Sequence, residues 1–169
     1  MGKIQIRNQI FETNSSSVHS LCISESGQEN SRLTVNKDGY VHVELDEYYG
    51  KDSRLYTSQM EKLKYICTWF WVYVGADAEL LEDDYLWRRF NEAFATYVNE
   101  HPGKRKNPVY CEGIKIDNIM GEYAGDFFDH QSMPEGRYDY SNCVVSLWNV
   151  GGVINFIFNK YLSLETGCD

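Results

Sequence analysis

The sequence predicts an α+β fold in which an N-terminal antiparallel sheet packs against two or more helices. Three observations indicate this fold: period-two patterning over residues 1–50, helical spacing of apolar residues over 57–101, and a mixed pattern over 108–169. We expect a single domain spanning 1–169, because a chain of this length can bury one continuous core.

The first fifty residues carry the pattern of strands. Polar and apolar side chains alternate over 18–23, as in a half-buried strand. Segments 32–35 and 40–45 flank Asn36-Lys37-Asp38-Gly39, and an Asp-Gly pair favours a tight turn, so we expect a hairpin here. The alternation within its second strand directs His42 to solvent.

Two helices are predicted in the middle of the chain. Ser58 and Glu61 have the spacing of a capping box, and apolar residues then follow at helical spacing until Gly75. A second helix should run from about Glu79 to Glu100, where His101-Pro102-Gly103 ends it. The remaining predicted elements are a strand over 109–116, a short helix over 153–158 and a closing strand over 161–164.

Charge and composition exclude several classes of function. The 25 acidic residues against 16 basic ones give a net charge of −9, which disfavours direct binding to nucleic acid, since phosphate contacts need clustered Lys and Arg. The longest apolar runs, such as 66–74, fall short of the roughly 20 residues of a membrane span, and no apolar signal core begins the sequence. We therefore expect a soluble cytoplasmic protein with reduced cysteines.

The most distinctive segment is Phe11-Glu12-Thr13-Asn14-Ser15-Ser16-Ser17-Val18-His19-Ser20. Its short polar side chains can satisfy backbone groups in a turn before a strand. A functional alternative gathers Glu12, the serines and His19 around one pocket, because Ser and His can form a nucleophile and base pair. The spacing favours the turn, since the sequence has no Gly-x-Ser-x-Gly elbow.

This opening block resembles that of a group of small, largely uncharacterised proteins from phages, prophages and gut bacteria. A second block, Phe128-Asp129-His130-Gln131-Ser132, and the endings Phe156-Ile157-Phe158-Asn159 and Thr166-Gly167-Cys168-Asp169 are also similar to that group. Cys168 stands where the group has Asn. The resemblance implies an origin in a mobile element and residence in a bacterial host cell. It implies no catalysed reaction.

Small acidic phage proteins often inhibit host defence, and some anti-CRISPR proteins are similar in charge and length. Our first hypothesis is therefore stoichiometric binding to a host defence nuclease or another basic nucleic-acid-binding protein, most specifically the RNA-guided nuclease of type II CRISPR systems. A carboxylate-rich surface complements a positive channel and speeds encounter. The alternative is that the acids are a solvated helix N-terminus. The candidate partner-binding residues are Asp77, Glu79, Glu82, Asp83, Asp84 and Phe127.

A structural zinc ion is the candidate cofactor. His19 and His130 lie in the two distinctive blocks, Cys67 could meet them in the core, and Asp129 could bind the metal or orient an imidazole. The alternatives are a buried Cys67 acting as a small apolar side chain and a His130 bonded to backbone.

Two rival functions use the same residues differently. A metal-dependent hydrolase would place Glu12, His19, Asp129 and His130 in one cleft around an open metal position. A structural phage component would instead self-associate. The sequence leaves the oligomeric state open.

Overall fold

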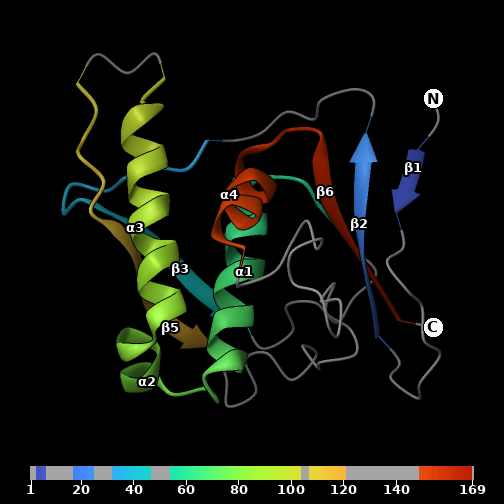
Figure 1. Cartoon of the computed structure of the whole chain (residues 1–169), viewed down its shortest axis with the longest axis horizontal. Coiled ribbons are helices and arrows are strands. Elements are labelled where there is room, and N and C mark those ends of the chain that lie inside the picture. The colour runs from blue at the N-terminus through green and yellow to red at the C-terminus, as the bar shows by residue number, and fades with distance from the viewer. Residues whose placement is uncertain are drawn as a thin grey trace.

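The computed structural model describes residues 3–6, 17–24, 32–46, 54–103, 107–120 and 149–168. These residues form an α+β fold, as predicted (Figure 1). In chain order the elements are β1 (Lys3–Ile6), β2 (Ser17–Ser24), β3 (Tyr40–Asp46), β4 (Arg54–Tyr56), α1 (Gln59–Tyr73), α2 (Ala78–Asp83), α3 (Tyr85–Glu100), β5 (Gly113–Met120), α4 (Val150–Phe158) and β6 (Leu162–Cys168).

The described strands form two sheets. The four-stranded sheet has the order β1-β2-β6-β4 and all its pairs are antiparallel. The N-terminal strands β1 and β2 belong to it, and of these β2 matches the strand predicted over 18–23. The C-terminal strand β6 is one of its two inner strands. A separate two-stranded sheet pairs β3 with β5 in parallel. In Figure 1 this second pair crosses beside α3 and α1, away from β1 and β2.

The predicted hairpin is wrong. Segment 32–36 forms no strand, because β3 takes β5 as its partner instead. The turn itself is present: the Gly39 N–H donates to the Asn36 carbonyl at 3.0 Å, and Gly39 has a φ of +89°, which a residue without Cβ adopts readily. A local turn therefore formed as predicted while the pairing was decided elsewhere in the chain.

The central helix α1 begins at the predicted capping box. The Ser58 hydroxyl accepts from the Glu61 N–H at 3.1 Å, and the Glu61 carboxylate accepts from the Ser58 N–H at 3.1 Å. The helix is buried almost all round, since Lys62, Tyr65 and Thr68 are enclosed together with its apolar residues. It packs on β3 and α4, so the core surrounds it.

The second predicted helix is two helices. Asp84 has extended backbone angles and ends α2, and its side chain then caps α3. The strand predicted from residue 109 begins only at Gly113, as β5. The predicted C-terminal helix and strand are present and longer than expected, as α4 and β6. No helix in the described ranges is both long and apolar enough to cross a bilayer.

Candidate functional site

The five predicted partner-binding carboxylates all lie on α2 and its two ends. Two of them hold the local backbone. Asp77 accepts hydrogen bonds from the N–H groups of Glu79 and Leu80 at 2.9 and 3.0 Å, and Asp84 accepts one from the Trp87 N–H at 2.8 Å. These bonds satisfy donors that helix starts leave unpaired. Asp77 and Asp84 therefore have a structural role in addition to any role in binding.

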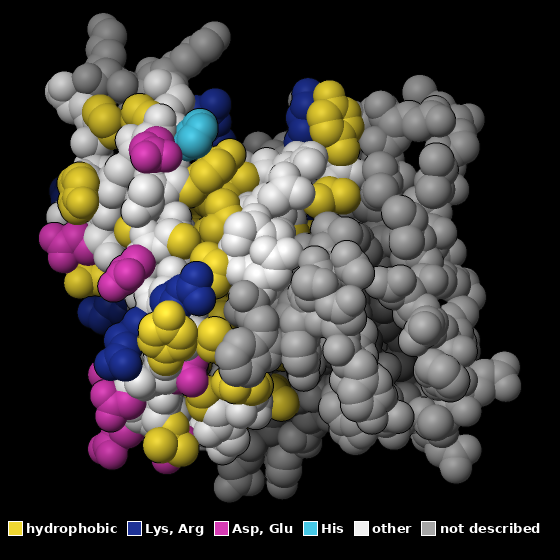
Figure 2. Space-filling model, viewed as in Figure 1, with side chains coloured by type: hydrophobic (Ala, Val, Ile, Leu, Met, Phe, Trp, Pro, Cys, Tyr) yellow, Lys and Arg dark blue, Asp and Glu magenta, His cyan; other side chains and the backbone are white. Residues whose placement is uncertain are grey.

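The other three carboxylates face solvent. Glu79, Glu82 and Asp83 are exposed, and none of their carboxylate groups has a hydrogen bond or ion pair to any residue that the structure describes. Figure 2 shows acidic side chains gathered over α2 at the lower left of the molecule, with basic side chains adjoining them along α3. These three charges are available to a partner without breaking an internal contact among the described residues.

Large apolar side chains are exposed around the same helix. Tyr73 at the end of α1 is 47% exposed, Leu80 on α2 is 57% exposed, and Tyr85 at the start of α3 is 61% exposed. We call the segment from Tyr73 to Tyr85 the acidic corner. Arg89 lies over the Tyr85 ring at 5.5 Å from its centre, which places a guanidinium at the border of the corner. Exposed Tyr and Leu among carboxylates can bury apolar area on a partner.

A sharp turn sets the direction of the acidic corner. The Ala76 N–H donates to the Trp71 carbonyl at 2.9 Å, and Ala76 has a φ of +60°, which L-residues rarely adopt. The turn ends α1 and reverses the chain, so that α2 packs against α3 with Leu81 buried. Burial of Leu81 directs the acidic residues of α2 outward.

The remaining predicted site residues are only partly described. Glu12, Phe127, Asp129 and His130 lie outside the described residues, and of His19 only the backbone, in β2, is described. The hydrolase and the zinc site therefore stay predictions. Among the described residues, no three His, Cys, Asp or Glu side chains form a group that could hold a metal ion.

Cys67 has the environment of a core residue. It lies on α1 and is fully buried, and burial raises the pKa of its thiol far above the usual range. A thiol in such surroundings stays protonated and packs as a small apolar group. This matches the structural alternative for Cys67 that the sequence left open.

Sequence reasoning missed a cluster around His42. The ring was predicted to point to solvent, but it is only 26% exposed and lies between two carboxylates: its Nε2 is 2.8 Å from Asp38 and its Nδ1 is 2.5 Å from Asp117. The hydrogen bond to Asp117, followed by that to Asp38, raises the pKa of His42. Because both ring nitrogens face a carboxylate, His42 has none left to act as a base. It connects β3 to β5 as a charged cross-link.

The His42 cross-link predicts a pH dependence. The folded pKa lies above the unfolded value of about 6.5, so its stabilisation is complete below that pH and is lost as pH rises through the folded pKa. Urea unfolding measured from pH 6 upward should show that the free energy of unfolding of wild type falls as pH rises through the folded pKa of His42. The His42→Gln variant should not show this fall. His101→Gln is the control and should keep the wild-type profile. Identical profiles for wild type and His42→Gln would contradict the prediction.

Comparison with known proteins gives no further guide to the site. No protein-family model, no curated protein and no solved structure matches this chain.

Proposed function

We propose that this chain binds a host protein with a basic nucleic-acid-binding surface and blocks that surface by occupying it. The observation that carries the proposal is the acidic corner. There Glu79, Glu82 and Asp83 are exposed and unpaired within the described residues, and Leu80 and Tyr85 are exposed beside them. Binding of this kind needs no turnover.

Charge and apolar area have different tasks in such a complex. Carboxylates steer the encounter with a positive surface and raise the association rate, and this effect weakens as salt screens them. The apolar side chains slow dissociation once they are desolvated, because aromatic anchors carry much of the energy of an interface. The acidic corner offers both kinds of group on one short segment.

The partner is a nuclease that handles nucleic acid in host defence, with the RNA-guided nuclease of type II CRISPR systems as the first case to test. Such an enzyme must expose a positive channel to hold its guide and target. A protein with a net charge of −9 is repelled by nucleic acid itself, so it competes for the channel rather than for the guide.

Neutralising the acidic corner tests the proposal. The triple variant Glu79→Gln, Glu82→Gln, Asp83→Asn removes three charges and leaves the caps Asp77 and Asp84 intact. Its association rate with the guide-free nuclease should fall about tenfold at low salt, since steering by clustered charge contributes at least that much. Surface plasmon resonance at low and high salt measures the rate, and the difference should shrink as salt rises.

A matched control separates local charge from total charge. The variant Glu44→Gln, Glu92→Gln, Glu100→Gln removes three exposed carboxylates outside the acidic corner and changes the net charge by the same amount. It should associate at close to the wild-type rate. Equal loss in both triple variants, or no complex between wild type and the nuclease, would overturn the proposal.

A further inference from the structure

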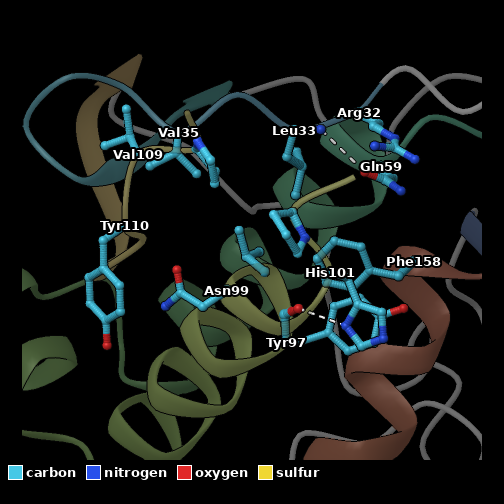
Figure 3. A pocket seen from close by; sticks show the side chains of 13 residues that line it. Arg32, Leu33, Val35, Gln59, Tyr97, Asn99, His101, Val109, Tyr110 and Phe158 are labelled. Atoms are coloured by element: carbon cyan, nitrogen blue, oxygen red, sulfur yellow. Dashed lines mark hydrogen bonds between the residues drawn. The ribbon is translucent and has the colours of Figure 1, made fainter. Parts of the chain in front are cut away.

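A pocket of about 520 Å³ lies at the C-terminal end of α3, whereas the acidic corner lies at its N-terminal end. It forms where the last turn of α3 meets segment 32–35, segment 108–110 and the end of α4. Figure 3 shows Leu33, Val35 and Val109 on one side, and Tyr97, His101 and Phe158 on another. Its volume is in the range of sites that hold small molecules, roughly 300–1,000 Å³.

One wall of this pocket is a stack of planar rings. Tyr97 lies between His101 and Phe158, with ring centres 4.1 Å and 4.3 Å apart and interplanar angles of 18° and 25°. The His101 Nδ1 donates to the Tyr97 carbonyl at 2.9 Å, which holds the imidazole in the stack. Because His101 and Phe158 cover both faces of Tyr97, another planar group can stack on the outer face of His101 or pack against the edges of these rings.

Two polar side chains of the pocket, Arg32 and Gln59, offer hydrogen-bond donors. Arg32 has no hydrogen bond or ion pair to a described residue, and its guanidinium lies so close to Gly103 that a Cβ there would be 1.5 Å from Nη1. Gln59 uses its Oε1 to accept from the Leu33 N–H at 3.2 Å, which leaves its amide N–H groups without a partner in the described chain. Both donors lie beside each other in Figure 3.

The charge of the pocket is opposite to that of the whole protein. None of the described residues that line it is acidic, although the chain carries 25 Asp and Glu residues and a net charge of −9. Arg32 is the one residue among the described lining that is always charged, and it is positive. A guanidinium that has no carboxylate partner among the described residues is suited to bind a carboxylate or a phosphate through two parallel hydrogen bonds.

We propose that this pocket binds a small planar anion, an aromatic ring carrying a carboxylate or a phosphate. The ring packs against the Tyr97 stack and the apolar side chains opposite it. The anionic group pairs with Arg32 and accepts from Gln59. The proposal is independent of the acidic corner, which shares no residue with the pocket.

The test uses two anionic probes, indole-3-carboxylate and adenosine 5′-monophosphate, with indole and adenosine as their neutral counterparts. Titrations followed by ¹H–¹⁵N NMR should show at least one anionic probe shifting the amides around Tyr97 and Tyr110. Its neutral counterpart should bind at least about tenfold more weakly. Comparing the affinities of the carboxylate probe and the phosphate probe shows which of the two anionic groups the pocket binds.

Three variants assign the binding to the pocket. Arg32→Gln should weaken the anionic probe about tenfold, whereas Arg88→Gln, which removes an exposed arginine at the other end of α3, should not. Val109→Trp should fill the pocket and abolish binding, since Val109 is exposed and its enlargement leaves the core unchanged. Far-UV circular dichroism melts confirm that each variant is folded.

The acidic-corner triple variant should bind the probes as wild type does, so failure of the proposed function leaves this result unaffected. Absence of binding by both anionic probes at about 5 mM would overturn the proposal. Equal binding by wild type and Arg32→Gln, or retained binding by Val109→Trp, would overturn it as well.

Discussion

Phe90→Ala should lower the free energy of unfolding by about 3–5 kcal/mol, the usual cost of removing a fully buried aromatic ring. Phe90 lies on α3 with no exposed surface, and its ring stacks on Phe70 at 5.2 Å between centres. Trp87 and Phe94 lie 5.8 and 6.2 Å away, so truncation opens a cavity whose walls are large rings. Rings held by several neighbours relax little into the space, which places the expected cost in this range.

Urea unfolding at 25 °C, followed by circular dichroism, measures the change. Tyr85→Ala, on the same helix but 61% exposed, is the control and should cost less than about 1 kcal/mol. A loss below about 1 kcal/mol in Phe90→Ala would mean that the cluster of α1 and α3 rings is not the centre of the core.

Lys62 should be the most sensitive charged residue among those described with their side chains. It is fully buried in α1, and its Nζ donates to the carbonyls of Asn159 and Leu162 at 2.9 and 3.1 Å, which ties α1 to the link between α4 and β6. Lys62→Ala removes the donor and leaves a cavity, at a cost of about 4 kcal/mol. Lys62→Met keeps the volume of the side chain and should lower the free energy of unfolding by about 2 kcal/mol, since only the hydrogen bonds are lost.

The same lysine predicts a rise of stability at alkaline pH. Burial lowers the pKa of Lys62 from 10.5 to about 8. Between these values the unfolded chain holds a proton that the folded chain has released, so stability increases with pH there, by about 3 kcal/mol in all. Other groups titrate in this range, and burial raises the pKa of Cys67, which acts in the opposite direction above its usual value. The quantity to measure is therefore the difference between wild type and Lys62→Met.

That difference should grow from pH 8 to about pH 10.5 in favour of wild type. A difference that does not vary with pH would show that Lys62 keeps its charge in the fold over this range. A Lys62→Met protein more stable than wild type at pH 7 would show that the desolvation cost exceeds the value of the two hydrogen bonds.

Local sequence patterns predicted where helices and strands begin and end better than they predicted which strands pair. The capping box at Ser58 and the end of α3 before Pro102 depend on a few adjacent residues, and both were predicted. The pairing of β3 with β5 joins segments about seventy residues apart, and no local pattern indicates which strand β3 chooses. A turn at Gly39 is compatible both with a hairpin and with the parallel pair of β3 and β5. The sequence pattern alone therefore predicted the wrong strand pairing.

In the candidate site, too, some features are visible in the sequence and others depend on the tertiary structure. Five acids among the eight residues 77–84 are visible in the sequence, but the capping roles of Asp77 and Asp84 appear only once α2 and α3 are separate helices. The partner of His42 at Asp117 depends on the parallel pair, and the donation from Lys62 to residues nearly a hundred positions later depends on how α4 packs. Each of these contacts follows from tertiary structure, which residue spacing does not encode.

The central place of β6 has a consequence during synthesis of the chain. Strand β2 pairs with β6 over nearly its whole length, from Ser17 with Cys168 to Ile23 with Leu162, so its partner is translated roughly 140 residues later. At roughly 5–20 residues per second a ribosome needs on the order of ten seconds to reach it. During that time β1 can cover only one side of β2, and the other side is open to neighbouring nascent chains. Expression yield should therefore depend on translation speed and on chaperones that shield this edge.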